Sequence, residues 1–250
     1  MINILSAFRF LTCIPLPYNG ATDPRQLGAS SAWFPLVGVF VGAMLILGNY
    51  LLEMIFNPSV VAALLITLVA ILTGGLHLDG LMDTADGLMG ALEPARILEI
   101  MRDSRIGAMG VLAAVLSLLL KWTLLTSLLN ANRDLVSTEG LLLIPTFGRW
   151  SMVYALYFFP YARAEVGLGR VFAEGAGLYQ LSIASFTSLL VAWFFGGMIG
   201  IITLMGVIIV TVILSRGIAK RIGGMTGDTY GAINEMNEVV ALLFLVGLKG

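Results

Sequence analysis

The fold and function of this chain depend on one stretch, TGGLHLDGLMDTADG at residues 73–87, which closes a long apolar run. It holds His77, the only histidine, and three acids, Asp79, Asp83 and Asp86. Because an α-helix turns about 100° per residue, these spacings place the three carboxylates on one helical face. Like charges beside hydrocarbon repel, and a cation such as Mg²⁺, which prefers carboxylate oxygens, removes that penalty. The stretch predicts a metal site; the alternative is a polar helix start with solvated acids.

Composition places the chain in a membrane. Of its 250 residues, 58% are hydrophobic and 12% are charged, and its mean hydropathy is +0.96. These values exclude a soluble globular domain and predict a protein that crosses the bilayer several times. The net charge of −1 predicts no nucleic-acid partner. The single Cys13 excludes an intramolecular disulfide, and the first residues lack the basic region of a cleaved signal peptide.

The apolar runs predict an all-α, polytopic membrane helix bundle that forms one domain over residues 1–250. A helix needs about 20 apolar residues to cross the hydrocarbon. An apolar segment at 2–12 is too short for this and is expected as an interfacial or re-entrant helix. Residues 195–197, Phe-Gly-Gly, are expected as a tight connection between two spans. The seven spans are expected at 31–53, 59–80, 108–129, 140–160, 178–195, 198–218 and 231–248.

Two segments outside the spans also have an expected structure. Residues 18–30 are polar and predicted as a loop. Glu93-Pro94 is expected to start a short amphipathic helix, because proline suits the first helical turn. Its apolar side chains, expected to lie on the membrane, are Ile97, Leu98 and Met101.

The basic residues give the orientation, because cytoplasmic loops of membrane proteins carry an excess of Lys and Arg. With seven spans, Arg133 and Lys249 fall on one side of the membrane. The other side, predicted to be cytoplasmic, carries Arg9, Arg25, Arg96, Arg102, Arg105, Arg163, Arg170, Arg216, Lys220 and Arg221. It also holds the acidic stretch 73–87 and a glycine-rich loop at 223–229. Polar clusters far apart in sequence therefore meet at one face.

A carboxylate-bound Mg²⁺ with arginines close by suits phosphate or diphosphate chemistry. The candidate metal ligands are Asp79, Asp83, Asp86 and Asp103. The candidate substrate-binding residues are Arg102, Arg105, Arg149, Gly223, Gly224, Asp228 and Glu235. Arginine clamps phosphate with two donors, and glycine lets the backbone approach closely. Ordinary alternatives are membrane anchors for the arginines, a polar helix start for the acids, and the general abundance of glycine in membrane helices.

His77 and Asp83 are the candidate catalytic residues. His77 is a candidate general base for an attacking hydroxyl, or it hydrogen-bonds a carboxylate or a phosphate. Asp83 or another carboxylate is the alternative base. Arg149 lies within a span and is expected to pair with an acid or a substrate phosphate. Lys121 also lies within a span, and its long stem is expected to let it snorkel.

Several blocks of the chain closely resemble the cobalamin synthase family, also called adenosylcobinamide-GDP ribazoletransferases. The most specific is GGLHLDGLMDTADG at residues 74–87. Further blocks, in the family's order, are Phe8…Thr12…Pro15, MRDSRIG at 101–107, GRW at 148–150 and GGMTGDT at 223–229. The likeness spans nearly the whole chain.

The resemblance implies the late joining step of cobalamin assembly. A hydroxyl of α-ribazole, or of its 5′-phosphate, attacks the phosphate linked to the cobinamide arm of adenosylcobinamide-GDP. GMP leaves and a phosphodiester forms. The resemblance also implies a need for Mg²⁺ and a place in the bacterial inner membrane. The protein's partners are then these two substrates and the lipid bilayer, with a homo-oligomer left open.

Three other classes of protein share parts of this pattern. A weaker likeness to CDP-alcohol phosphotransferases supports the type of mechanism alone, because Asp79-Gly80 is not followed by their Ala-Arg. An ion-coupled transporter would place acids near the bilayer midplane on several spans, whereas most acids here fall at span ends. A prenyltransferase would carry a closely packed Asp-Asp-x-x-Asp pattern, which this sequence lacks.

Overall fold

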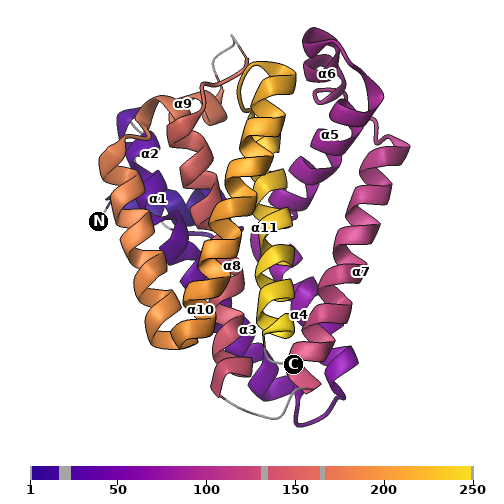
Figure 1. The fold of residues 1–250 in the computed structure, drawn as a ribbon, viewed down its shortest axis with the longest axis vertical. Helices are drawn as coiled ribbons and strands as arrows, with labels where there is room; N and C mark the ends of the chain where they lie inside the picture. The colour runs from indigo at the N-terminus through magenta and orange to yellow at the C-terminus, as the bar shows by residue number, and fades with distance from the viewer. Residues whose placement is uncertain (1, 17–23, 131–134, 164–166, 249–250) are drawn as a thin grey trace.

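The computed structural model describes residues 2–16, 24–130, 135–163 and 167–248. These residues contain no strand, only an isolated β-bridge between Tyr161 and Met225. The all-α prediction is confirmed, and Figure 1 shows long helices packed side by side in an elongated bundle. In chain order the helices are α1 (Ile2–Leu11), α2 (Pro24–Ala29), the 3-10 helix η1 (Ser30–Trp33), α3 (Phe34–Leu52), α4 (Pro58–Thr73), α5 (Leu76–Gly90), α6 (Pro94–Ile100), α7 (Ala108–Asn130), α8 (Leu135–Phe158), α9 (Leu168–Gly175), α10 (Leu178–Ile222) and α11 (Gly227–Gly247).

The helix lengths are those of a multi-pass membrane protein. Within the described ranges, four segments are long and apolar enough to cross a bilayer, or five if the bent pair α4–α5 counts as one span. The four are Gln26–Leu52, Ala108–Asn130, Glu139–Phe158 and Leu178–Ile222. The 45-residue α10 reverses direction at Gly197, where φ is 54° and ψ is −138°. Figure 1 shows its two arms side by side, so the predicted connection at 195–197 is confirmed, while the number of seven spans stays a prediction.

The span predicted at 59–80 is not one continuous helix, because α4 stops at Thr73 and the chain bends by 90° into α5. The cause is a pair of left-handed glycines, Gly74 (φ 63°) and Gly75 (φ 71°), a conformation that residues with a Cβ disfavour. The break leaves the Leu72 carbonyl outside the helical pattern, and it accepts a hydrogen bond from the Cys13 amide at 2.7 Å. The acidic stretch is helical, as predicted, but it runs in a new direction.

Helix α8 lies at the centre of the bundle, against α3, α10 and α11. Its contact with α3 is close because Gly38 and Gly42 face the backbone of Pro145 and Leu142, where an added Cβ would clash. Small residues let membrane helices approach closely enough for van der Waals contact to hold them together. Helices α7 and α10 instead expose rows of large apolar side chains, as expected of surfaces that face lipid.

Three details differ from the sequence prediction. The expected loop at 18–30 contains α2 and the start of η1, although its residues 18–23 lie outside the described ranges. Helix α9 was not predicted. Helix α6 forms as expected after Glu93, but Ile97 and Met101 are buried in the core, where both pack against Gly87. That glycine gives α6 room to fold back onto α5.

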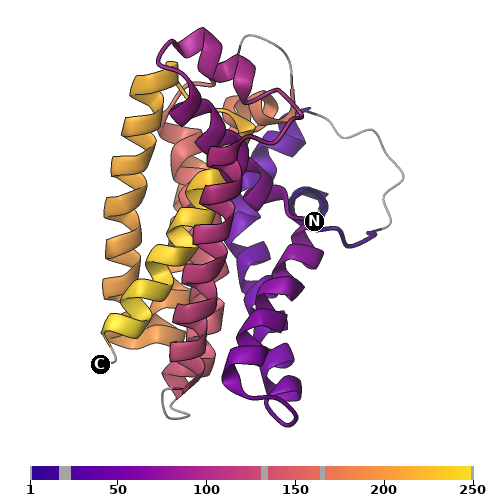
Figure 2. The ribbon, with the colours of Figure 1, turned by 90° about the vertical axis from the view of Figure 1, so that its right-hand side faces the viewer.

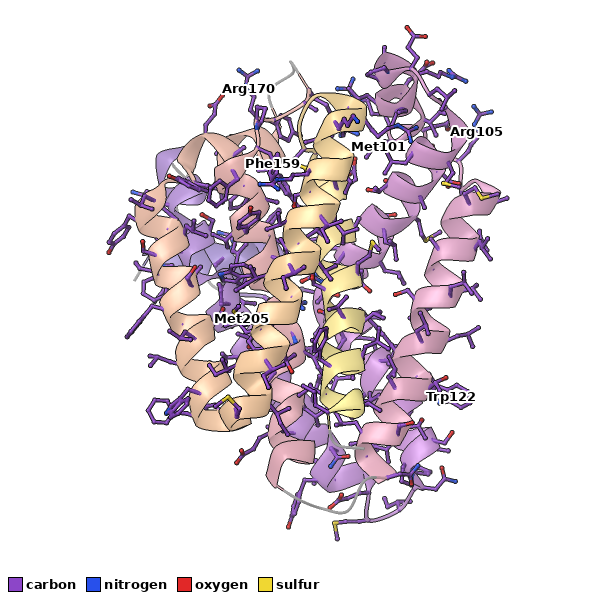
Figure 3. The ribbon with its side chains drawn as sticks, in the orientation of Figure 1. Met101, Arg105, Trp122, Phe159, Arg170 and Met205 are labelled. Carbon is purple, nitrogen blue, oxygen red and sulfur yellow. The ribbon has the colours of Figure 1, made fainter. Side chains whose placement is uncertain are left out.

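The polar segments gather at one end of the bundle. Figures 1 and 2 place α6 at this end and the C-terminus near the other. Figure 3 shows Arg105 and Arg170 at the α6 end, with Trp122 well away from it. At the same end Arg221 of α10 donates hydrogen bonds to the carbonyls that follow the acidic stretch, at 2.8 and 3.0 Å. Arg133, Lys249 and the side chain of Arg25 lie outside the described residues.

We expect Gly75→Ala to destabilise the protein. The site has open space, so the cost of about 1–2 kcal/mol comes from the left-handed backbone alone. The thermal unfolding midpoint in detergent measures it. The matched control is Gly217→Ala, a helical glycine that also has open space and whose replacement is expected to be neutral or stabilising by up to about 1 kcal/mol. Equal midpoints for the two variants would contradict this explanation of the bend.

Candidate active site

Helices α5 and α11 cross at two glycines. A Cβ on Gly80 would lie 2.6 Å from the Asp228 carbonyl oxygen, and one on Gly231 would lie 3.2 Å from the Cα of His77. The two backbones are therefore in direct contact. This crossing brings the acidic stretch of α5 against the first turn of α11, two segments that are about 150 residues apart in the sequence.

A cavity of about 160 Å³ opens at this crossing. Its polar wall is formed by His77, Asp79, Asp228 and Tyr230. The rest of the lining is mostly apolar and includes three mutually packed aromatic rings, Phe10, Phe34 and Phe172, with ring centroids 4.3–6.0 Å apart. The cavity thus combines charged groups with flat apolar surfaces.

Four acids of the two helices form one electrostatic group. The charges of Asp79, Asp228 and Asp86 all act on Asp83, and Arg163 opposes them. Arg163 donates a hydrogen bond to the Asp228 carboxylate at 2.7 Å. The structure therefore brings Asp79, Asp83, Asp86 and Asp228 together, as the sequence predicted for the first three. It also adds Arg163, which the sequence marked only as one of ten basic residues on its side.

Within this group, the Asp86 carboxylate already binds backbone amides of another helix. Its carboxylate accepts hydrogen bonds from the amides of Gly107 at 2.8 Å and Gly110 at 2.7 Å. These amides belong to the start of α7, where a helix leaves its first N–H groups without internal partners and favours a negative charge. Asp86 was predicted as a metal ligand, and the structure shows it instead capping α7.

Asp103, Arg105 and Arg102 lie on the exposed segment between α6 and α7. Asp103 and Arg105 bind each other through two donors of the guanidinium, at 2.6 Å and 3.0 Å. These hydrogen bonds lower the pKa of Asp103 to about 2. Asp103, the candidate fourth metal ligand, therefore pairs with a candidate phosphate ligand, and neither lines the cavity. Arg102 is exposed beside them.

Glu235 and Arg149 belong to a buried ionic network deeper in the bundle. Lys121 of α7 donates to Glu235 at 2.7 Å and to Glu238 at 2.5 Å, and Arg149 of α8 binds Glu238. Arg149 is completely buried. Of the two partners predicted for Arg149, the structure shows the acid. Lys121 does not snorkel, because two buried carboxylates neutralise it.

The glycines Gly223 and Gly224 of the 223–229 loop allow a turn and a close contact between backbone segments. Gly223 ends α10 in a left-handed conformation (φ 79°), and Gly224 packs against the carbonyl of Pro160, where a Cβ would clash. Next to it, the Met225 amide donates to Pro160, and the Ala162 amide donates to Met225, both at 2.8 Å. The close pairing positions the segment that carries Arg163. Gly227, three residues after Gly224, is the loop glycine that lines the cavity.

A model of the cobalamin-5-phosphate synthase family matches residues 3–246. The chain belongs to this family. Similar relatives are the adenosylcobinamide-GDP ribazoletransferases of Desulforamulus reducens (44% identical), Desulfitobacterium hafniense (41%) and Thermoanaerobacter pseudethanolicus (35%). Each alignment covers 96–98% of this chain and 94–97% of the relative. No solved structure matches.

Membership in the cobalamin-5-phosphate synthase family makes the chain a transferase of cobalamin synthesis. The resemblance carried by the blocks at 74–87, 101–107, 148–150 and 223–229 is confirmed. Both the transporter and the prenyltransferase are set aside, because the whole chain aligns with transferases of one kind.

Asp86 and Asp79 should behave differently on mutation. Asp86→Asn replaces one of the two carboxylate oxygens that accept hydrogen bonds from the Gly107 and Gly110 amides. It is expected to destabilise the protein by about 1–3 kcal/mol. Asp79 is exposed, so Asp79→Asn should leave the thermal midpoint within about 1 °C of wild type. Thermal unfolding of the two variants in the same detergent tests this. A wild-type midpoint for Asp86→Asn would remove its capping role.

Proposed function

We propose that the protein transfers the adenosylcobinamide-phosphate group from adenosylcobinamide-GDP to α-ribazole or α-ribazole 5′-phosphate and releases GMP. The proposal rests chiefly on the cavity between α5 and α11, whose carboxylates and nearby Arg163 suit a diphosphate. The names of the relatives supply the donor and the class of acceptor.

The reaction makes clear demands on the site. An oxygen of the ribazole hydroxyl forms a bond to the phosphorus linked to the cobinamide arm, the bond from that phosphorus to the GMP oxygen breaks, and the hydroxyl proton passes to a base. The site must hold the diphosphate, balance its charge and orient the attacking hydroxyl. Arg163 binds Asp228, which lines the cavity. It is suited to bind a phosphate oxygen.

Mg²⁺ is part of the proposal, with Asp79, Asp83 and Asp228 as its ligands. Carboxylate oxygens are the donors that Mg²⁺ prefers. Within the described residues, no three His, Cys, Asp or Glu side chains are already gathered into a group that could hold a metal ion. The fit therefore rests on donor chemistry: the charges of Asp79 and Asp228 both act on Asp83. The ion would balance the negative charge of the carboxylates and of the diphosphate.

We place the enzyme in the bacterial inner membrane with this cavity at the cytoplasmic end. The support is the basic end of the bundle, which carries Arg105 and Arg170, together with the positive-inside rule. The rule assigns the end that is rich in arginine to the cytoplasm. Nucleotide substrates are cytoplasmic, so the orientation also suits the chemistry. A homo-oligomer stays a prediction.

The proposed reaction is tested with protein purified in detergent and mixed with adenosylcobinamide-GDP and α-ribazole 5′-phosphate. We expect GMP release and a new corrinoid phosphodiester with Mg²⁺, and neither with chelator. Asp83→Asn is expected to reduce both to background while leaving membrane insertion intact. Repeating the assay with α-ribazole compares the two acceptors.

Asp103→Asn is the matched control, because Asp103 pairs with Arg105 outside the cavity. It should keep activity within about threefold of wild type, as expected of an exposed ion pair. Normal turnover by Asp83→Asn would exclude the proposed ligand set, and equal loss in both variants would bring Asp103 back into it.

A further inference from the structure

The ring of His77 has one nitrogen without a partner. His77 is 2% exposed and lines the cavity, and within the described residues its Nε2 makes no hydrogen bond. Leaving a buried polar atom unpaired costs about 1–3 kcal/mol. An unpaired ring nitrogen on a residue that lines the cavity therefore indicates a group that a ligand completes.

The other ring nitrogen determines where the proton sits. An Nη atom of Arg149 lies 3.4 Å from Nδ1 of His77. A guanidinium offers only N–H donors and stays charged, so Nδ1 must be the acceptor. In a neutral imidazole one nitrogen accepts and the other donates. The proton is therefore on Nε2, the nitrogen that has no protein partner.

The surrounding charges hold this state in place. Arg149 is fully buried and bound to Glu238. The Glu238 carboxylate also accepts hydrogen bonds from Lys121 and, at 3.2 Å, from Asn234. A proton on Nδ1 would point at the N–H donors of Arg149, so the donor geometry excludes it. Neither Arg149 nor its acid can turn away, since the network ties α5, α7, α8 and α11 together.

We propose that His77 is a hydrogen-bond donor to a phosphate oxygen in the cavity and that Arg149 is the residue that positions it. A nitrogen that already carries a proton cannot take one from the attacking hydroxyl. The role of general base then falls to a carboxylate beside the cavity, such as Asp83, on which the charge of the cavity residue Asp79 acts. The part of this inference that concerns turnover rests on the proposed function, and the part that concerns the proton position does not.

The proton position is read directly by ¹⁵N NMR of histidine-labelled, full-length protein in detergent, prepared with an affinity tag that contains no histidine. The chain has a single histidine, so its two ring nitrogens are the whole signal. We expect the Nε2–H tautomer near neutral pH. A ring protonated on Nδ1, or on both nitrogens, would overturn the proposal.

The dependence on Arg149 is tested in the same spectrum. Arg149→Gln, whose amide can donate or accept, should give a mixture of tautomers. Arg163→Gln, which removes a different arginine near the cavity, should leave the tautomer unchanged. An unchanged pure Nε2–H signal in Arg149→Gln would remove Arg149 as the positioning residue. If Arg149→Gln does not fold, the wild-type spectrum and the His77 variants still decide the proposal.

The role in turnover is tested with His77→Gln and His77→Ala. A glutamine amide can place an N–H near the position of Nε2, so His77→Gln should stay within about tenfold of wild type. His77→Ala loses the donor and should be slower by about 100-fold or more. Equal loss in both would indicate a base and overturn the donor role. Absence of GMP release by wild type would instead contradict the proposed function and leave the NMR result standing.

Discussion

Two consecutive glycines in the left-handed conformation set the geometry on which the rest of the site depends. Because Gly74 and Gly75 end α4 and turn the chain through 90°, α5 runs across the bundle to meet α11 rather than continuing α4. The meeting of α5 with α11 places Asp79 and Asp228, one acid from each helix, at one cavity. The same turn sets His77 at the start of α5, within reach of Arg149. A straight helix would separate these groups.

The second constraint is the charge balance inside the bundle. Lys121 and Arg149 on one side, and Glu235 and Glu238 on the other, form a neutral set away from water. Such a network stabilises little in itself, because each ion loses its hydration, but removing one member leaves a buried charge unpaired. The network therefore favours a single arrangement of α7, α8 and α11. That arrangement is the frame against which α5 and its histidine are fixed.

The sequence was sufficient for the features that depend on local pattern. Helical spacing predicted that Asp79, Asp83 and Asp86 share one helical face, and the motif blocks predicted the family. Contacts between distant segments could not be read in the same way. Asp86 caps α7 because Gly107 and Gly110 approach it. Arg163 reaches Asp228 because Tyr161, two residues before it, pairs with Met225. Both depend on helix crossings that spacing along the chain does not encode.

The network of Lys121, Arg149, Glu235 and Glu238 also determines when the helices can assemble during synthesis. Lys121 and Arg149 each lie near the middle of an apolar helix, where a lone cation costs about 3 kcal/mol to insert. Their acidic partners are both on α11, which is translated after α7 and α8. Until it arrives, α7 and α8 hold charges that nothing within them neutralises. Assembly of α7 and α8 thus stays incomplete until α11 has been made and supplies both carboxylates.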